Sequence, residues 1–409
     1  MLKNYFKIAI AVLRRRKFFT FISLFGISFT LTILMVATAF IDKIANDDYP
    51  DKKRDRSLYV AHIELRGKDA MNSTSPSYYF LKHFVGSLKT PVKMAISSQF
   101  RSTNTYVNNR KIVINYKYTD ASYWDVTEYK FLEGKAITSQ QVANAEHVTV
   151  ISEDMKNEYF GGDAGPVVGK YIEADNVKYR VCGVVKNIPI TAYFFYADIY
   201  LPYTVAKNDF NKDKGYMGDF NAILLAANKE DVPKMQQEFD AMVPKIPMPN
   251  KLFNTLYTHA DTYIVGFVRT GNETKSGVMY VLIALVIFAL FVMLLPTLNL
   301  VNINVTRIME RSSEIGVRKA FGASSQTLVY QFIAENLILT FLGGIIGVVL
   351  SVIAMYFINN AKLIANLDLT LNFTVLLFAM LICIFFGLLS GVYPAWRMSK
   401  LNVVTALKA

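Results

Sequence analysis

The sequence is poor in cysteine and in charge, and both shortages limit what the chain can be. Its two cysteines are Cys182, in a globular stretch, and Cys383, in an apolar run. No disulfide within one domain is therefore predicted, and cysteine usage does not indicate the redox compartment. Charged residues make up 19% of the chain and hydrophobic residues 53%. This balance is too apolar for an ordinary soluble protein.

Residue patterns that carry chemistry are also lacking. The four histidines, His62, His83, His147 and His259, are scattered without metal-ligand spacing. The stretch GPVVGKY at 165–171 has one residue too few between its glycines for a phosphate loop, and ends in Tyr rather than Ser or Thr. No G-x-S-x-G nucleophile motif is present. We therefore expect no catalytic residue, metal or cofactor in this chain, so that any energy source must come from a partner.

The apolar residues gather in four runs, Phe18–Ile41, Val278–Thr306, Leu328–Phe357 and Leu371–Pro394. Each run reaches the ~20 residues that a helix needs to cross a hydrocarbon core of ~30 Å. The stretch between the first two runs has ordinary globular composition. The sequence therefore predicts an α-helical membrane protein with four transmembrane helices and a large domain between spans 1 and 2.

The basic residues lie where the ends of these spans meet one side of the membrane. Of the net charge of +12, residues 1–17 supply six, residues 307–319 supply two and the tail after the fourth run supplies three. By the positive-inside rule this side is the cytoplasm, which places both termini inside and the large domain outside. The basic surplus is thus interpreted as topology in a lipid membrane, and we expect no nucleic-acid partner.

These patterns predict the following order of segments. They are a cytoplasmic amphipathic helix (1–17), span 1 (18–41), an extracytoplasmic domain (42–276), span 2 with a stalk (277–306), a cytoplasmic coupling segment (307–327), span 3 (328–358), a short outer loop (359–370), span 4 (371–394) and a cytoplasmic tail (395–409).

Two alternatives concern the first segments. Residues 2–13 have apolar positions at helical spacing, which indicates either a helix on the cytoplasmic leaflet or a continuation of span 1. The ATA at 37–39 resembles a signal-peptide cleavage site, but the apolar run before it exceeds the usual signal length. An uncleaved anchor is favoured.

The outer domain mixes β-rich stretches with amphipathic helices. The segments 57–65, 111–118 and 147–152 are β-rich, and 170–185 predicts two strands about a hairpin turn at Asp175 and Asn176. Ser152 is a candidate N-cap for a helix that stops at Gly161 and Gly162. Residues 230–243 place Val232, Met235, Phe239 and Met242 on one face, so this helix should cover a sheet. An α+β domain is predicted, and the charged run 46–56 is interpreted as a solvated exit from span 1.

Small and polar residues mark faces of the later spans. Gly343, Gly347 and Ser351 follow one another at intervals of four in span 3, and Gly387 and Gly391 repeat this spacing in span 4. Such faces permit close helix packing, within one chain or between two. Glu335 is the acid inside the third run, for which interfacial packing is favoured over a proton relay. Asn299, Asn302 and Asn304 in span 2 are assigned to helix packing rather than to a water path.

The segment MERSSEIGVRKAFGAS at 309–324 is unusual because charge pairs and a glycine stop stand between two spans. Arg311 and Glu314 are spaced i,i+3, and Glu314 and Arg318 are spaced i,i+4, as suits a helix. Ile308 and Ile315 share an apolar side, which Phe321 extends. Gly322 fits a helix C′ position, and Ser324 or Ser325 can cap the next helix. A plain loop obeying the positive-inside rule would explain Arg318 and Lys319 but not the paired acids. We predict a short rigid helix suited to receive a push from a soluble motor.

This motif also resembles a known family. ERSSEIGVRKAFGASSQTLVYQFIAENLILTFLGGIIG closely resembles the signature of the MacB/FtsX-type (type VII) permeases of ABC transporters. The tail GVYPAWRMSKLNVVTALKA and the entry YFKIAIAVLRRRKFFTFISLFGIS are similar to the family's closing and opening segments. The stretch 148–189 looks like the family's periplasmic core domain. The resemblance covers nearly the whole chain.

The resemblance implies a noncatalytic permease in the bacterial inner membrane, paired with a separate ATP-binding subunit and with a second permease copy or paralogue. It leaves open a periplasmic adaptor or an outer-membrane channel as a further partner. The implied activity is export or extraction driven by movement of the outer domain. In this chain the residues implied in ATPase coupling are Glu310, Arg311, Glu314, Ile315, Gly316, Arg318, Lys319, Phe321 and Gly322. The rival functions are mechanical regulation of envelope enzymes without transport, and a ligand-sensing receptor.

Overall fold

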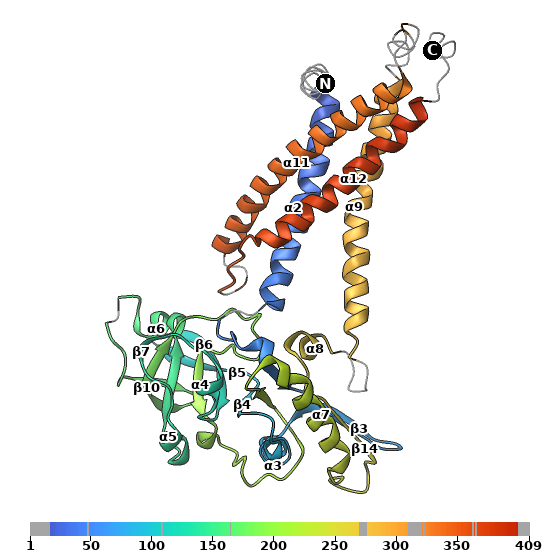
Figure 1. The fold of residues 1–409 in the computed structure, drawn as a ribbon. Coiled ribbons are helices and arrows are strands. Elements are labelled where there is room, and N and C mark those ends of the chain that lie inside the picture. Colours follow the sequence, from blue (N-terminus) through green and yellow to red (C-terminus); the bar gives the residue numbers. More distant parts are fainter. Residues whose placement is uncertain are drawn as a thin grey trace. The chain divides into compact units, whose positions relative to one another are not determined.

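The computed structural model describes residues 17–46, 49–107, 109–163, 165–269, 276–309, 317, 321, 324–361, 364 and 366–399. The chain forms two compact units (Figure 1). The helical unit comprises Met1–Lys43, Leu282–Leu363 and Asp368–Ala409, and the α+β unit comprises Ile44–Val281 and Ile364–Leu367. Each unit is described by itself.

The helical unit is built from long helices that follow the apolar runs. They are α2 (Lys17–Ala45), α9 (Val278–Met309), α11 (Ser325–Ala361) and α12 (Phe373–Ser399). A helix satisfies its backbone polar groups internally, which is what an apolar surrounding demands of an uncharged run. Of the two serines that could cap α11, the structure selects Ser324, because its Oγ accepts from the N–H of Thr327 at 3.2 Å.

The directions of these helices follow from their contacts. Ile27 and Leu31 of α2 lie against Gly343 and Gly347 of α11, so the two helices run in parallel. Helix α12 runs antiparallel to α11, as the traces in Figure 1 also show. An apolar cluster of Leu31, Leu34, Met35, Met293 and Ala379 joins α2, α9 and α12.

Two described helices, Lys17–Ala45 and Val329–Ala361, are long and apolar enough to cross a membrane. Over the described residues, the apolar stretches of α9 and α12 are shorter, and they cover Val278–Leu294 and Leu376–Leu389. Candidate spans therefore occur near both ends of the chain, and the total of four spans stays a prediction.

The α+β unit contains a ten-stranded mixed sheet and a four-stranded antiparallel sheet. The large sheet has the order β1-β13-β4-β6-β11-β8-β10-β7, with β5 paired to β6 and β9 paired to β10. Its strands are β1 (Ser57–Val60), β4 (Lys93–Ser98), β5 (Arg101–Val107), β6 (Arg110–Thr119), β7 (Phe131–Gly134), β8 (Val148–Ser152), β9 (Tyr171–Ala174), β10 (Val177–Val185), β11 (Ile199–Pro202) and β13 (Phe220–Leu225). The pairs β6–β11 and β8–β10 are parallel.

The small sheet has the order β12-β3-β2-β14. Its strands are β2 (Ile63–Arg66), β3 (Met71–Pro76), β12 (Met217–Gly218) and β14 (Thr255–Thr258). The β-rich stretch 57–65 is therefore two strands in two sheets. The break falls at Ala61 and His62, just after Tyr59 forms an isolated bridge with Asp261.

Short helices cover the sheets. They are α3 (Tyr78–His83), α4 (Tyr123–Val126), α5 (Ser139–Ala143), α6 (Glu153–Phe160), α7 (Val232–Met242) and α8 (Tyr263–Val268). The predicted N-cap is confirmed, because Ser152 Oγ accepts from the N–H of Met155 at 3.1 Å, and α6 ends at Gly161 with a φ of 94°. The predicted hairpin is also confirmed: Asp175 and Asn176 both have positive φ between β9 and β10.

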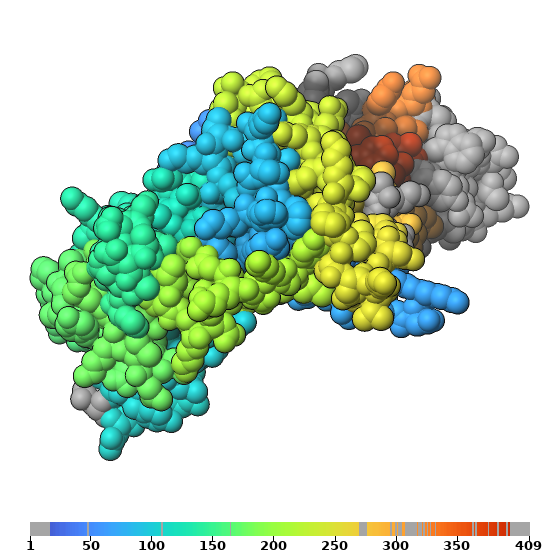
Figure 2. All heavy atoms as spheres, turned by 90° about the horizontal axis from the view of Figure 1, so that it is seen from below, coloured from blue at the N-terminus to red at the C-terminus, as the bar shows by residue number. Residues whose placement is uncertain are grey.

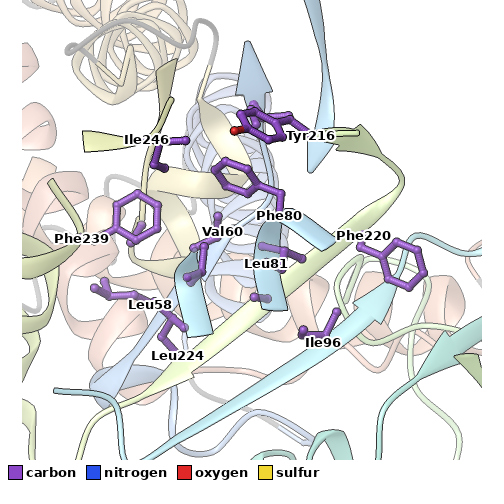
Figure 3. Packing of buried hydrophobic residues seen from close by; sticks show 14 of the residues in the cluster. Leu58, Val60, Phe80, Leu81, Ile96, Tyr216, Phe220, Leu224, Phe239 and Ile246 are labelled. Carbon is purple, nitrogen blue, oxygen red and sulfur yellow. The ribbon is translucent and has the colours of Figure 1, made fainter. Parts of the chain in front are cut away.

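The largest apolar cluster lies where α3 and α7 meet β1 and β13 (Figure 3). Phe80 and Leu81 of α3 and Phe239 of α7 are fully buried there, close to Leu58 and Leu224. The predicted apolar face of 230–243 is thus confirmed as the covering face of α7. Figure 2 shows one face of this unit, on which early segments (blue) lie between green and yellow ones from later in the chain.

Candidate functional site

The predicted small-residue face of α11 lies against α2 within the helical unit. A Cβ built on Gly343 would stand 2.8 Å from the Cβ of Ile27, and one on Gly347 would stand 2.9 Å from the Cβ of Leu31. The Oγ1 of Thr32 donates to the carbonyl of Gly347 at 3.3 Å, and the buried Ser351 donates to the same carbonyl at 2.6 Å. The two helices approach this closely because neither glycine carries a side chain.

A second close approach joins α11 to α12. A Cβ on Gly387 would stand 2.2 Å from Thr340 Oγ1, and one on Gly344 would stand 3.0 Å from the Met380 side chain. Gly391 lies in α12, but its surroundings lie outside the described residues. Helix α11 is thus packed through glycines on two sides, against α2 and against α12.

The acid in the third apolar run is buried rather than exposed. Glu335 in α11 is 2% exposed, and its Oε1 accepts from Nε2 of Gln331 at 3.3 Å. The same part of α11 also buries Asn336 and Thr340. This arrangement supports the packing interpretation of Glu335, since a carboxyl group in an apolar surrounding needs polar neighbours.

The α+β unit holds a buried ionic cluster that the sequence did not predict. The charged run 46–56 was expected to be solvated, and this expectation is wrong for its central residues. The side chains of Arg54 and Asp51 are only 9% and 6% exposed, and Arg54 Nε donates to Asp51 Oδ2 at 2.8 Å. The Tyr59 hydroxyl donates to the same oxygen at 2.6 Å. The guanidinium of Arg54 also lies 3.7 Å from the ring centroid of Tyr263.

The same cluster contains a second ion pair. Asp261 exchanges two backbone hydrogen bonds with Tyr59, at 2.7 and 3.0 Å. Both carboxylate oxygens of Asp261 accept from Arg269, at 2.5 Å from Nε and 2.6 Å from Nη2. We call Asp51, Arg54, Tyr59, Asp261, Tyr263 and Arg269 the Arg54 cluster. These contacts join residues 51–59, which follow α2, to residues 261–269, which precede α9.

Burial and charge set the ionisation of the cluster. Burial by itself would lower the pKa of Arg54, but the hydrogen bond and the charge of Asp51 outweigh it and raise that pKa. Burial raises the pKa of Tyr59 well above its usual value and that of Tyr263 to about 12. The arginine is therefore charged and both tyrosines are neutral near pH 7. The only sequence signal for this cluster was the i,i+3 spacing of Asp51 and Arg54.

Among the residues that the structure describes, no group of three or more His, Cys, Asp or Glu side chains could hold a metal ion. Cys182 is largely buried, where its Sγ donates to the carbonyl of Thr149 and burial raises its pKa to about 11. A thiol with a raised pKa is a poor nucleophile.

Comparison with known proteins identifies the family. Residues 20–242 match the model of the MacB-like periplasmic core domain, which is more than half of the chain, and residues 286–403 match the FtsX-like permease C-terminal model. The chain belongs to the MacB/FtsX-type ABC transporter permeases. The predicted family is thus confirmed, and with it a membrane protein that carries a large α+β extracytoplasmic domain.

Individual relatives of this permease are distant. The chain is 26% identical over 304 residues to the macrolide export ATP-binding/permease protein MacB of Mannheimia succiniciproducens, covering 74% of this chain and 44% of that protein. It spans about half the length of the MacB relatives that it matches. The uncharacterized ABC transporter permease YknZ of Bacillus subtilis is 22% identical, covering 78% of this chain and 75% of YknZ.

A solved structure of the periplasmic region of MacB from Actinobacillus actinomycetemcomitans is also similar to this permease. It is 15% identical with a TM-score of 0.37, covering 56% of this chain and 100% of that one.

The residues predicted to couple to an ATPase lie mostly outside the described residues. This applies to Glu310, Arg311, Glu314, Ile315, Gly316, Arg318, Lys319 and Gly322. Of the described residues in this region, Phe321 donates its N–H to the carbonyl of Val317 at 3.0 Å. The side chain of Phe321 is 89% exposed.

Proposed function

We propose that this chain is the noncatalytic membrane subunit of an ABC transporter in the bacterial inner membrane. It has four spans and cytoplasmic termini, and it works as a dimer with a separate subunit that binds ATP. Closure of that motor pushes on residues 307–322, and the helices pass the movement to the α+β unit outside. The movement drives export or extraction of a substrate rather than chemistry in this chain.

The Arg54 cluster is the observation that carries this proposal. Residues of the chain after α2 and of the chain before α9 both belong to it. Arg54 Nη1 donates to the carbonyls of Ile44 and Asn46, at 2.9 and 2.6 Å, so the end of α2 is itself held. Charge-assisted hydrogen bonds are shorter and stronger than neutral ones, so these contacts restrain the end of α2. A domain that must follow its helices needs such a joint, and a domain that only binds does not.

The motor contact is proposed to divide between apolar and charged residues. Ile315 and Phe321 fill a groove on the ATP-binding subunit, and Gly316 allows close approach. Glu310, Arg311 and Arg318 rim the contact and steer association. Buried apolar anchors often contribute ~2 kcal/mol or more each, whereas rim charges contribute mainly to the association rate.

Co-purification with the ATP-binding subunit tests this contact. Ile315→Asp should insert normally but lose the subunit, because it places a charge in an apolar groove. Val113→Asp is the control, because it places the same charge at an exposed position of β6 in the α+β unit, outside the proposed contact. If Ile315→Asp retains the ATPase at wild-type stoichiometry, the segment is only a charged loop.

Hydrogen exchange of the intact complex tests the movement. ATP with vanadate should change amide exchange in residues 261–268 relative to the nucleotide-free complex, and Ile315→Asp should abolish the change. Exchange in the α+β unit that is the same in both nucleotide states would refute mechanical transmission.

A further inference from the structure

A cleft of about 290 Å³ opens in the α+β unit beside the Arg54 cluster. Three chain segments that are far apart in sequence line it: residues 61–62 after β1, residues 193–194 before β11, and residues 266–269 at the end of α8. Asn221 in β13 and Gln99, the residue after β4, complete the lining. The volume is at the lower end of what small-molecule sites occupy.

Aromatic rings dominate the walls. Phe194 is buried, and its ring is fixed against Tyr59 and Tyr263, with centroid distances of 5.2 and 5.5 Å. Tyr193 and Phe267, from different segments, leave large rings exposed at the same cleft. A cleft lined by one buried ring that packs against two others and by two exposed rings fits a flat aromatic ligand.

The charged and titratable residues of the lining give it no net charge at neutral pH. The guanidinium of Arg269 is neutralised by both oxygens of Asp261. Burial lowers the pKa of His62, and the nearby Arg269 lowers it further, so this imidazole is neutral near pH 7. A charged ligand would lose its hydration here without gaining an opposite charge, and an uncharged one is therefore favoured.

Two amides give the cleft polar groups of fixed orientation. Asn221 Oδ1 accepts from Ser97 Oγ at 3.0 Å, which leaves its nitrogen as the group to donate to a ligand. Gln99 Nε2 donates to Ser75 Oγ at 2.5 Å, which leaves its carbonyl oxygen as the group to accept. A ligand that can both donate and accept, such as an amide or a phenol, matches this pair.

We propose that this cleft binds a small uncharged aromatic molecule, about one or two rings in size and bearing an amide or hydroxyl group. The occupant contacts Gly266 and Phe267, in the segment that leads into α9. Binding itself does not depend on ATP or on a motor subunit. The proposal therefore stands or fails separately from the proposed transport function.

Photolabelling of the full chain in lipid nanodiscs tests the site. The probe is 4-benzoylbenzamide, and its anionic counterpart of nearly the same shape is 4-benzoylbenzoate. Mass spectrometry should find saturable insertion of the amide in peptides containing residues 193–194 and 266–269. Labelling of the lipid-facing helices α9 and α11 reports probe delivery in the same sample.

Filling the cleft provides the critical variants. Ala61→Phe should raise the probe concentration that gives half-maximal labelling of these peptides at least about tenfold, which corresponds to ~1.4 kcal/mol of binding free energy. Gly266→Leu is a second filling variant in case the first fails to fold, because a Cβ at Gly266 meets its nearest neighbour at an ordinary 3.6 Å. Val113→Phe, at an exposed site on β6, is the control and should leave labelling unchanged.

Three results would overturn the proposal. They are the absence of saturable labelling at the two peptides in the wild type, equal labelling in the folded filling variants, and labelling by the benzoate at or above that of the amide. The last result would assign the cleft to anions instead.

Discussion

Removing the charge of Arg54 is the sharpest perturbation that the structure offers. In Arg54→Met, the buried carboxylate of Asp51 keeps the Tyr59 hydroxyl but loses the hydrogen bond and the charge of Arg54, and Tyr263 loses the guanidinium on its ring. Breaking a buried pair by removing one partner costs about 3–5 kcal/mol. Lys93→Met is the matched control, because Lys93 pairs with Asp125 while 51% and 58% of the two side chains are exposed. Such an exposed pair contributes at most about 1 kcal/mol.

The two tryptophans, Trp124 and Trp396, make this measurable. In a Trp396→Phe background, Trp124 alone reports on the α+β unit, where its ring packs 5.3 Å from that of Tyr129. Urea unfolding in nanodiscs is followed by Trp124 fluorescence. The free energy of unfolding should fall by at least about 2 kcal/mol more in Arg54→Met than in Lys93→Met. The double variant Asp51→Asn with Arg54→Met should regain part of the loss, because a neutral amide is less costly to bury than the carboxylate. Equal losses in Arg54→Met and Lys93→Met would show that the cluster is hydrated and does not stiffen the joint.

Three further predictions address other parts of the chain. Gly347→Leu should disrupt assembly in native gels, because a side chain at this position collides with α2. Val349→Leu, at an exposed position of α11, is the control and should assemble normally. Normal assembly of Gly347→Leu would show that Gly347 is not needed for helix packing. Burial lowers the pKa of Lys117 from 10.5 to about 7, so the unfolded chain binds more protons between these values. The free energy of unfolding should therefore rise from pH 7 to 10.5, and Lys117→Met should flatten that rise in the same Trp124 assay; an unchanged slope would contradict it. In a cysteine-free background, a Cys at Ser73 should react with an impermeant reagent in intact cells and a Cys at Ser312 should not, and labelling at 312 would reverse the topology.

Several features of the outer domain could be predicted from local sequence signals. Ser152 caps α6, Asp175 and Asn176 turn a hairpin, and Met235 and Phe239 are buried on one face of α7. Each depends on residues within a few positions of one another. The spacing of Gly343 and Gly347 likewise marked a close-packing face, but it could not name Ile27 and Leu31 as the neighbours, since these come from another helix.

The Arg54 cluster could not be predicted from the sequence, because it depends on residues that are far apart in the chain. Asp51 and Arg54 stand in a run that composition alone assigns to solvent, and their burial depends on Tyr59 and on Tyr263, which comes much later in the chain. The cleft beside the cluster has the same origin, because three distant segments must meet to form it. Periodicity reports which face of an element is apolar, whereas it does not report which elements meet.

Under the proposed function, helix α2 carries force from α11 to the α+β unit. Within the helical unit, Ile27 and Leu31 fit against glycines of α11, where contacts this close leave no space for one helix to slide without moving the other. At its far end, α2 is held by the bond from Arg54 to the carbonyl of Ile44. Under the proposed function, a displacement of α11, the helix that follows the predicted coupling segment, is passed to the α+β unit through these packed side chains and this buried ion pair. Arg54→Met, which loosens the end of α2, should therefore leave ATP hydrolysis by the partner intact while movement of the outer domain is lost.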